Sequence, residues 1–558
     1  MFFVNARMLK YKFRTISLAL LIFVASGPAS NGPPAAAKKP NILVILVDDL
    51  RWDALGISSH PFFKSPNIDR IGNEGAIFRN AFVVHSLCSP SRATLLTGLY
   101  THQHGVVNND IQLKPHLPTV PKILQAAGYE TALIGKWHMG LDAQPKPGFN
   151  HWVSFRSQGS YIDPELNVDG KTQNAKGHMT DILTDFTLDF LSKDRTAPFF
   201  VILSHIAVHE PLTVQERFAG KYEKENVTLP LSYGENPSGK PEFLKCRSFR
   251  NDSLLTDKVK RYFETLDGVD ECVGKLFDKL SEKGILDETL IVFTSDNGYF
   301  LGEHNLVDKR AAYEESIRIP LLIRYPNWFA VSAVFPKLMA LNLDIAPTLL
   351  EAAGIEAPPG MPGLSLRKLA RGEVQRQSFL YEYFFIPRDS CTPAMRAIRT
   401  QSYKYITYFD TTQTAELYDL VKDPVEVRNL INDSTYTEVL KRLRFQLDSL
   451  RVATGDSTVI DTVVEASDKS IRGFALYPNY PNPFNAGTTI KYALTRAMHV
   501  KLKLFDIHGR EVATLVDEIQ PAGINSIHLN SSHLSSGVYF YRLIAGAFEE
   551  TQKLVIIK

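Results

Sequence analysis

Short apolar runs alternate with helix-like stretches from Asn41 to about Gly354. Such alternation predicts βα units and a mainly parallel sheet covered by helices on both faces. In open α/β sheets, ligands bind beyond the carboxyl ends of the strands. If four of these runs are neighbouring parallel strands, the polar residues that follow them meet at one site. The four runs are NILVILV (41–47), TALIG (131–135), FFVILSH (199–205) and LIVFTS (290–295).

The rest of the chain predicts two further units. Residues 378–453 alternate strand-like runs with a final amphipathic helix near 439–450, which indicates a smaller α+β subdomain. Residues 454–473 are polar without a long period and predict a linker. Residues 474–558 carry short strand-like runs separated by Gly or Asn, the pattern of an all-β sandwich. The aromatic stretch around Tyr381 is either buried core or a surface that stacks on a ligand.

The amino-terminal segment has the pattern of an export signal. Basic residues precede the apolar run ISLALLIFVA, and small residues follow it. This order predicts a secretory signal peptide over residues 1–30. The apolar run is short for a bilayer span, so an uncleaved anchor is the alternative. We therefore expect an exported protein without a stable membrane span.

Composition excludes several classes of partner. The 558 residues include 62 Lys and Arg against 60 Asp and Glu, a net charge of +2, and no basic run interleaved with aromatics favours nucleic acid. Four cysteines are too scattered for a disulfide framework or a CxxC metal site, although a single bridge stays open. They are Cys88, Cys246, Cys272 and Cys391.

Four residues at the ends of two predicted strands suggest a metal site. Asp48, Asp49, Asp296 and Asn297 offer only oxygen donors, which suit calcium or magnesium better than zinc. Three packed carboxylates would also repel one another unless a cation compensated them. The alternative is a pair of turns capped by Asp and Asn.

Basic residues gather in the same part of the pattern. Around a metal, such residues form a pocket for a compact, multiply charged oxyanion, and a histidine there can protonate a leaving oxygen. The alternative for any one of these basic residues is an ordinary solvated or core side chain without a role in a site. They are Arg92, Lys136, His138, His209 and Lys309.

The stretch HSLCSPSRATLLTG (85–98) places Cys88 before a helix predicted to begin at Ser89 or Pro90. The free N–H groups of a helix amino terminus attract anions and can lower the pKa of a thiol. Cys88 is thus either a thiolate nucleophile or a small half-buried residue in a turn. A soft sulfur contributes little to a pocket built for a hard metal and an oxyanion.

The string CSPSR (88–92), followed by LLTG, resembles the Cys-x-Pro-x-Arg signature of the type I sulfatases. In that family a maturation enzyme oxidises the cysteine to formylglycine, whose aldehyde hydrate attacks sulfur. The resemblance implies that Cys88 is the precursor of the nucleophile.

Other motifs occur in the order of that family. VDDLRWDALG and TSDNGYFLGEH resemble its two metal motifs, and GKWHMG, HIAVHEP and DKR resemble its sulfate-binding segments. The resemblance covers residues 39–453 and implies an alkaline-phosphatase-like fold, with a catalytic domain at 39–377 and the subdomain at 378–453. It implies one Ca²⁺ per active site, held by Asp48, Asp49, Asp296, Asn297 and the modified Cys88. The implied catalytic residues are Cys88, Arg92, Lys136, His138, His209 and Lys309, with Ser157 or Ser160 as a further serine.

The segment 296–326 is similar to the sulfatase branch that includes N-acetylglucosamine-6-sulfatases. This similarity implies a sulfated carbohydrate of mucin or glycosaminoglycan as the substrate. Two alternatives stay open: a phosphonate monoester or phosphodiester hydrolase with the same motifs, and a non-catalytic glycan-binding relative.

The strings LYPNYPNPFNAGTTIKYAL (476–494) and SSGVYFYRLIAG (535–546) resemble the carboxy-terminal sorting domain of proteins exported by the type IX system of Bacteroidetes-like bacteria. The resemblance implies the secretion machinery as a partner and a secreted or cell-surface location. The alternative is a carbohydrate-binding β-sandwich.

Overall fold

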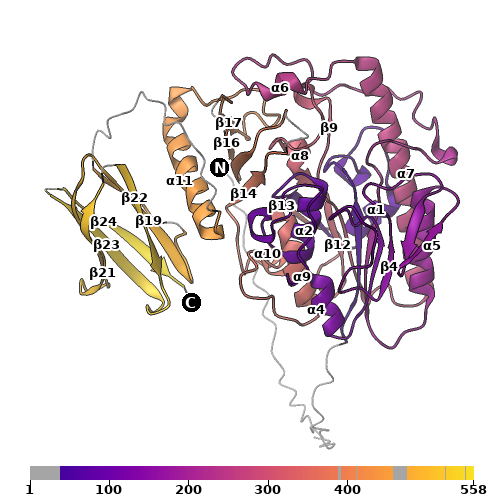
Figure 1. The fold of residues 1–558 in the computed structure, drawn as a ribbon, viewed down its shortest axis with the longest axis horizontal. Coiled ribbons are helices and arrows are strands. Elements are labelled where there is room, and N and C mark those ends of the chain that lie inside the picture. The colour runs from indigo at the N-terminus through magenta and orange to yellow at the C-terminus, as the bar shows by residue number, and fades with distance from the viewer. Residues whose placement is uncertain are drawn as a thin grey trace, which may run out of the picture. The chain divides into compact units, whose positions relative to one another are not determined.

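The computed structural model describes residues 38–386, 391–410, 412–456, 474–479, 481–521, 523–546 and 548–557 (Figure 1). The predicted signal peptide lies outside the described residues, and so do residues 457–473 of the predicted linker. Among the described helices, none combines the length and the apolar character needed to cross a bilayer.

The central sheet is mixed, and its middle strands are parallel. Within the described residues it contains eleven strands in the order β11-β2-β12-β8-β1-β7-β3-β4-β5-β6, with β13 beside β2. Strands β8, β1, β7, β3 and β4 run parallel. The bounds are β1 (Asn41–Val47), β2 (Ala76–Phe82), β3 (Glu130–Gly135), β4 (His151–Ser154), β5 (Glu165–Val168), β6 (Lys171–Asn174), β7 (Phe199–Ser204), β8 (Thr289–Ser295), β11 (Arg318–Ile319), β12 (Leu321–Arg324) and β13 (Ala333–Leu341).

The four apolar runs singled out in the sequence are the neighbours β8, β1, β7 and β3, which confirms that their carboxyl ends share one edge. Their side chains are buried on both faces. Along β1, Ile42 and Val44 join one core cluster, whereas Leu43 and Ile45 join the other. A strand buried on both sides needs an unbroken apolar run, which is why these segments lack the alternation of a half-exposed strand.

Helices cover both faces, as the alternation predicts (Figure 1). One core cluster includes residues of α2 (Cys88–Thr97), α4 (Val120–Ala126), α9 (Ile345–Ala352) and α10 (Leu366–Ala370). The other includes residues of α1 (Pro66–Asn73), α5 (Met179–Ser192) and α7 (Asp252–Glu282). Shorter elements are α3 (Thr101–His104), α6 (Phe243–Cys246), α8 (Glu314–Ile317), β9 (Phe300–Leu301), β10 (Val307–Asp308) and the 3-10 helices η1 (Gly56–Ser58), η2 (Glu216–Phe218), η3 (Glu303–Asn305), η4 (Asn342–Asp344) and η5 (Ser434–Tyr436).

A smaller four-stranded antiparallel sheet follows, as predicted. It consists of β14 (Ser378–Tyr383), β15 (Met395–Thr400), β16 (Tyr403–Tyr408) and β17 (Glu416–Asp419), and α11 (Thr437–Thr454) contacts three of these strands. Tyr381 and Tyr383 are fully buried in the core cluster that also contains β1 side chains. These two tyrosines are therefore core, whereas Phe385 at the end of the aromatic stretch is 54% exposed.

The carboxy-terminal residues form two antiparallel sheets, as expected for an all-β sandwich. Side chains of both sheets, such as Ile490 and Leu502, share one apolar cluster. One sheet contains β18 (Ala475–Leu476), β19 (Gly487–Leu494) and β22 (Gly523–Asn530), and the other contains β20 (Met498–Phe505), β21 (Glu511–Gln520), β23 (Gly537–Ala545) and β24 (Phe548–Ile556).

Cys246 and Cys391 form the one disulfide among the described residues, and it joins positions 145 residues apart. The sequence left such a bridge open without identifying its members. Cys88 and Cys272 are free and buried.

His304 is buried between two acidic side chains. Its Nδ1 lies 3.1 Å from Glu235 Oε1, and its Nε2 lies 3.7 Å from Glu315 Oε2. Burial alone would lower the pKa of His304, but the two carboxylates outweigh it and raise the pKa to about 9.

We expect the melting temperature to fall as the pH rises from 6.5 through about 9, because the folded-state pKa of His304 exceeds the ordinary value of 6.5. The stabilisation is complete below the unfolded-state pKa and is lost as the folded state deprotonates. The free energy of unfolding should fall by about 3 kcal/mol over this range. Thermal unfolding of wild type and His304→Gln across this range measures it. An equally steep decline in the variant would contradict the assignment to His304.

Candidate active site

Two pairs of polar residues meet where β1 and β8 end. Asp48 and Asp49 follow β1, and Asp296 and Asn297 follow β8. The strands pair in parallel up to Val47 opposite Ser295, so the two pairs are adjacent. Oxygens of Asp48, Asp49 and Asp296 lie within 4.8 Å of one another, and all three residues are no more than 1% exposed.

Cations from other strand ends and from α2 balance these carboxylates. Lys136, directly after β3, contacts Asp48, and Lys309, directly after β10, contacts Asp49. Arg92 on α2 donates from Nε to Asp296 Oδ2 at 2.8 Å. Each buried carboxylate therefore has a cationic partner, as buried charges require.

Arg92 is also fixed by neutral acceptors. Its Nη1 donates to the Lys136 carbonyl oxygen at 2.8 Å and to Ser204 Oγ at 2.6 Å. Ser204 is the last residue of β7, so β3 and β7 both orient the guanidinium. Ser204 was not among the site residues predicted from the sequence, although its position at a strand end was a usable signal.

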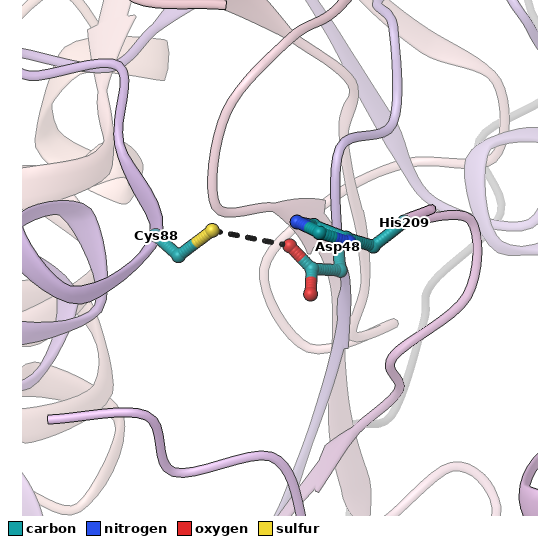
Figure 2. A group of neighbouring side chains, drawn as sticks. All are labelled: Asp48, Cys88 and His209. Atoms are coloured by element: carbon teal, nitrogen blue, oxygen red, sulfur yellow. Dashed lines mark hydrogen bonds between the residues drawn. The ribbon is translucent and has the colours of Figure 1, made fainter. Parts of the chain in front are cut away.

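Cys88 lies at the first position of α2, so the helix begins one or two residues before the predicted start at Ser89 or Pro90. Its Sγ lies 3.5 Å from Asp48 Oδ1, and Figure 2 shows the sulfur and the His209 ring both directed toward Asp48. Burial alone would raise the pKa of the Cys88 thiol, but the Lys136 and Lys309 ammonium groups lower it well below its ordinary value.

The two predicted histidines differ in the direction of their pKa shifts. His209 Nε2 lies 3.7 Å from Asp49 Oδ2, and although burial opposes it, this carboxylate raises the pKa of His209. Burial and then Lys136 lower the pKa of His138. Its Nδ1 is buried without a hydrogen-bond partner among the described residues. The pKa values of the two imidazoles are therefore shifted in opposite directions, and His138 is neutral.

The acidic side of the site fits a hard divalent cation. Burial raises the pKa of Asp49 and of Asp296, a cost that a bound cation would remove. Asn297 Nδ2 donates to Asp49 Oδ1 at 2.5 Å, while Asn297 Oδ1 is buried without a partner among the residues described. An orphaned amide oxygen beside three carboxylate groups is a donor set suited to calcium or magnesium.

A pocket of about 450 Å³ lies over this cluster. Gln158, which contacts Lys136, contributes to the pocket wall and was not among the site residues predicted from the sequence. Ser160, one candidate for a further serine, is exposed and donates to the Ile162 carbonyl oxygen at 2.9 Å. The pocket is lined by Asp49, Leu87, Asn109, Gln158, His209, Glu210, Arg247, Tyr299, Val307, Asp308, Lys309 and Arg310.

Three family models match the chain. The model described as Sulfatase matches residues 40–355, and that of the N-sulphoglucosamine sulphohydrolase C-terminal region matches 302–453. The model of a secretion system C-terminal sorting domain matches 479–558.

Individual proteins agree with these matches. The N-acetylglucosamine-6-O-sulfatase of Bacteroides thetaiotaomicron is 31% identical over 501 residues, covering 76% of this chain and 89% of that protein. A solved structure described as a complex with its substrate D-glucosamine-2-N,6-O-disulfate has a TM-score of 0.72 at 30% identity and covers 76% of this chain and 100% of that one. The phosphonate monoester hydrolase of Agrobacterium radiobacter has a TM-score of 0.62 at 23% identity, covering 74% and 96%, a likeness of fold alone.

We expect Asp296→Asn to weaken the binding of a divalent cation by about tenfold or more, because the cluster loses one of its three carboxylates while its shape is kept. Calorimetric titration measures the affinity, and circular dichroism checks the fold. Asp189→Asn, an exposed change on α5, is the matched control. Equal affinity in the two variants would contradict the assigned ligand set.

Proposed function

The chain belongs to the sulfatase family and is a sulfuric ester hydrolase, and from that premise we propose that it removes 6-O-sulfate from N-acetylglucosamine residues of a mucin or glycosaminoglycan. The named activities of the relatives supply the sugar and the sulfate position. The observation that carries the chemistry is the buried cluster in which Lys136, Lys309 and Arg92 face carboxylates. Lys309 and Asp49 of this cluster also line the pocket above it.

Membership of the family implies a divalent metal and a formylglycine. We assign the metal as Ca²⁺, held by Asp48, Asp49, Asp296 and Asn297 with the modified residue 88, because these protein donors are hard oxygens. When bound, the metal supplies positive charge that polarises a sulfate oxygen. If a maturation enzyme converts residue 88 to formylglycine, addition of water to the aldehyde would give a hydrate, whose hydroxyl group is a harder nucleophile than a thiolate.

The cations of the pocket bind the sulfate group and stabilise charge as it develops. Lys136 and Lys309 follow two different strands, and each ammonium group is held in place by its own carboxylate, that of Asp48 or Asp49. Arg92 holds Asp296 in place through a buried ion pair at 2.8 Å. These groups need no reorganisation when a sulfate oxygen enters the pocket.

His209 is the proposed proton donor to the leaving sugar oxygen. Its Nδ1 donates to the Glu210 carbonyl oxygen at 2.6 Å, which fixes the ring and leaves Nε2 on the side of Asp49. His138 is more deeply buried and serves as a neutral hydrogen-bonding group.

The match to a sorting domain supports export. We propose that the signal peptide and the type IX machinery direct the protein to the cell surface or the medium. The domain limits at 39–377, 378–453, 454–473 and 474–558 belong to this proposal. We also propose that the carboxy-terminal domain, residues 474–558, takes no part in catalysis.

A direct test is sulfate release from N-acetylglucosamine-6-sulfate by the matured protein, with a phosphonate monoester assayed in parallel. We expect sulfate release with a much lower rate on the phosphonate. A higher rate on the phosphonate than on the sulfate ester would favour the alternative, a phosphonate monoester hydrolase.

We expect Cys88→Ala to lower turnover by about 10⁴-fold or more, because it removes the precursor of the nucleophile. Cys272→Ala is the matched control: Cys272 is the other free, buried cysteine, and burial raises its pKa to about 12. Ion chromatography of released sulfate measures both variants. Wild-type turnover in Cys88→Ala would exclude the formylglycine mechanism.

A further inference from the structure

Lys309 lies between two residues with an unusual backbone conformation. Asp308 and Arg310 have φ values of 82° and 94°, a left-handed region that non-glycine residues rarely adopt. Such a conformation persists only where the surroundings hold it in place. Relaxation of either residue would move the Lys309 ammonium group away from Asp49, its partner in the cluster. The position of Lys309 therefore depends on the contacts that hold this segment.

Both polar backbone atoms of Arg310 are held by side chains. Arg310 N donates to Ser316 Oγ at 3.0 Å, and Tyr381 Oη donates to the Arg310 carbonyl oxygen at 2.6 Å. Ser316 belongs to α8, whereas Tyr381 belongs to β14 of the smaller sheet. Burial raises the pKa of Tyr381, so its hydroxyl group stays protonated and able to donate. Two distant parts of the sequence thus fix one peptide segment.

The same two side chains also bind the segment that leads to Cys88. Ser86 N donates to Tyr381 Oη at 3.3 Å, and Ser316 Oγ donates to Ser86 Oγ at 2.7 Å. The Ser86 hydroxyl group in turn donates to the Ser316 carbonyl oxygen at 2.8 Å. Tyr381 and Ser316 therefore join the segment just before residue 88 to the segment just after Lys309.

Ser316 is also bonded to the segment that carries the residues after β8. Its carbonyl oxygen accepts from Gly298 N at 2.9 Å, and Gly298 directly follows Asn297. Ser86, Ser316 and Tyr381 are all fully buried. In such an interior, water does not replace a hydrogen bond that a substitution removes. Loss of one of these bonds should therefore displace the segments that they join.

We propose that Tyr381 and Ser316 are positioning residues for the sulfatase reaction. Through the backbone of Ser86 and Arg310, they fix the Lys309 ammonium group relative to the nucleophile derived from residue 88. A displacement of about 1 Å between reacting groups can lower the rate about 100-fold, so this spacing matters. The inference rests on the proposed function and adds that the smaller subdomain, through β14, helps to build the active site.

Tyr381→Phe removes the hydroxyl group and keeps the buried ring. We expect it to lower kcat by about tenfold per matured site, and Ser316→Ala to do the same, because Lys309 then stabilises the developing charge less well. Steady-state kinetics on N-acetylglucosamine-6-sulfate measures kcat. Mass spectrometry of the peptide that contains residue 88 counts the matured sites, so a loss of maturation or of folded protein does not lower this value.

Tyr541→Phe is the matched control. Tyr541 Oη accepts from Asn479 N at 2.7 Å and donates to the Tyr477 carbonyl oxygen at 2.9 Å, and the side chain is fully buried in the carboxy-terminal domain. The change removes the same pair of bonds without altering a segment of the active site, so kcat should stay at the wild-type value. Wild-type kcat in both Tyr381→Phe and Ser316→Ala would overturn the inference.

A double-mutant cycle with Lys309→Ala distinguishes positioning from a merely structural role. If Tyr381 acts through Lys309, Tyr381→Phe should lower kcat by much less than tenfold once the ammonium group is absent. A general structural defect would lower kcat by the same factor in both backgrounds, and that result would contradict the proposed role.

Binding of inorganic sulfate separates this inference from the proposed function. Calorimetry on the same matured preparations should give a Kd that Tyr381→Phe raises by about threefold or more and that Tyr541→Phe leaves unchanged. A wild type that shows this difference but releases no sulfate from the sugar would contradict the proposed function alone. Equal Kd values for wild type and Tyr381→Phe would overturn the inference even if sulfate is released.

Discussion

The burial of three carboxylates at one edge of the sheet is the constraint on which the rest of the site depends. Asp48, Asp49 and Asp296 are removed from water within 4.8 Å of one another, and such a group is unstable without compensating charge. Lys136, Lys309 and Arg92 supply that charge from the ends of β3 and β10 and from α2. The same balance makes the pocket suitable for a divalent cation together with an anionic substrate.

This constraint explains which parts of the site the sequence reveals. Asp48, Lys136 and Asp296 each follow a long buried strand, so the pattern of apolar runs is enough to predict that they meet. The strands that these residues follow lie in the order β8-β1-β7-β3, with β1 paired to both β7 and β8. The sequence could predict that strands existed and where they ended. The family motif, and not the periodicity, located Lys309.

Residues on loops could not be predicted in the same way. Gln158 contacts Lys136 from an irregular segment without periodicity. Arg247, also in the pocket wall, directly follows Cys246, whose disulfide partner Cys391 lies 145 residues away. No local pattern encodes such contacts. The division has a physical sense: Asp48, Lys136 and Asp296 lie at the ends of rigid central strands, whereas Gln158 and Arg247 lie on loops, which vary more readily.

The measurement that tests the central claim most directly is the mass of the peptide containing residue 88, from protein made in its native host or together with an active maturation enzyme. Conversion of Cys88 to formylglycine would make this peptide about 18 Da lighter than the cysteine form. The account predicts that loss, together with sulfate release by the same preparation. An unmodified thiol, with the maturation enzyme shown to be active on a control sulfatase, would contradict it and would favour a glycan-binding relative without catalytic activity.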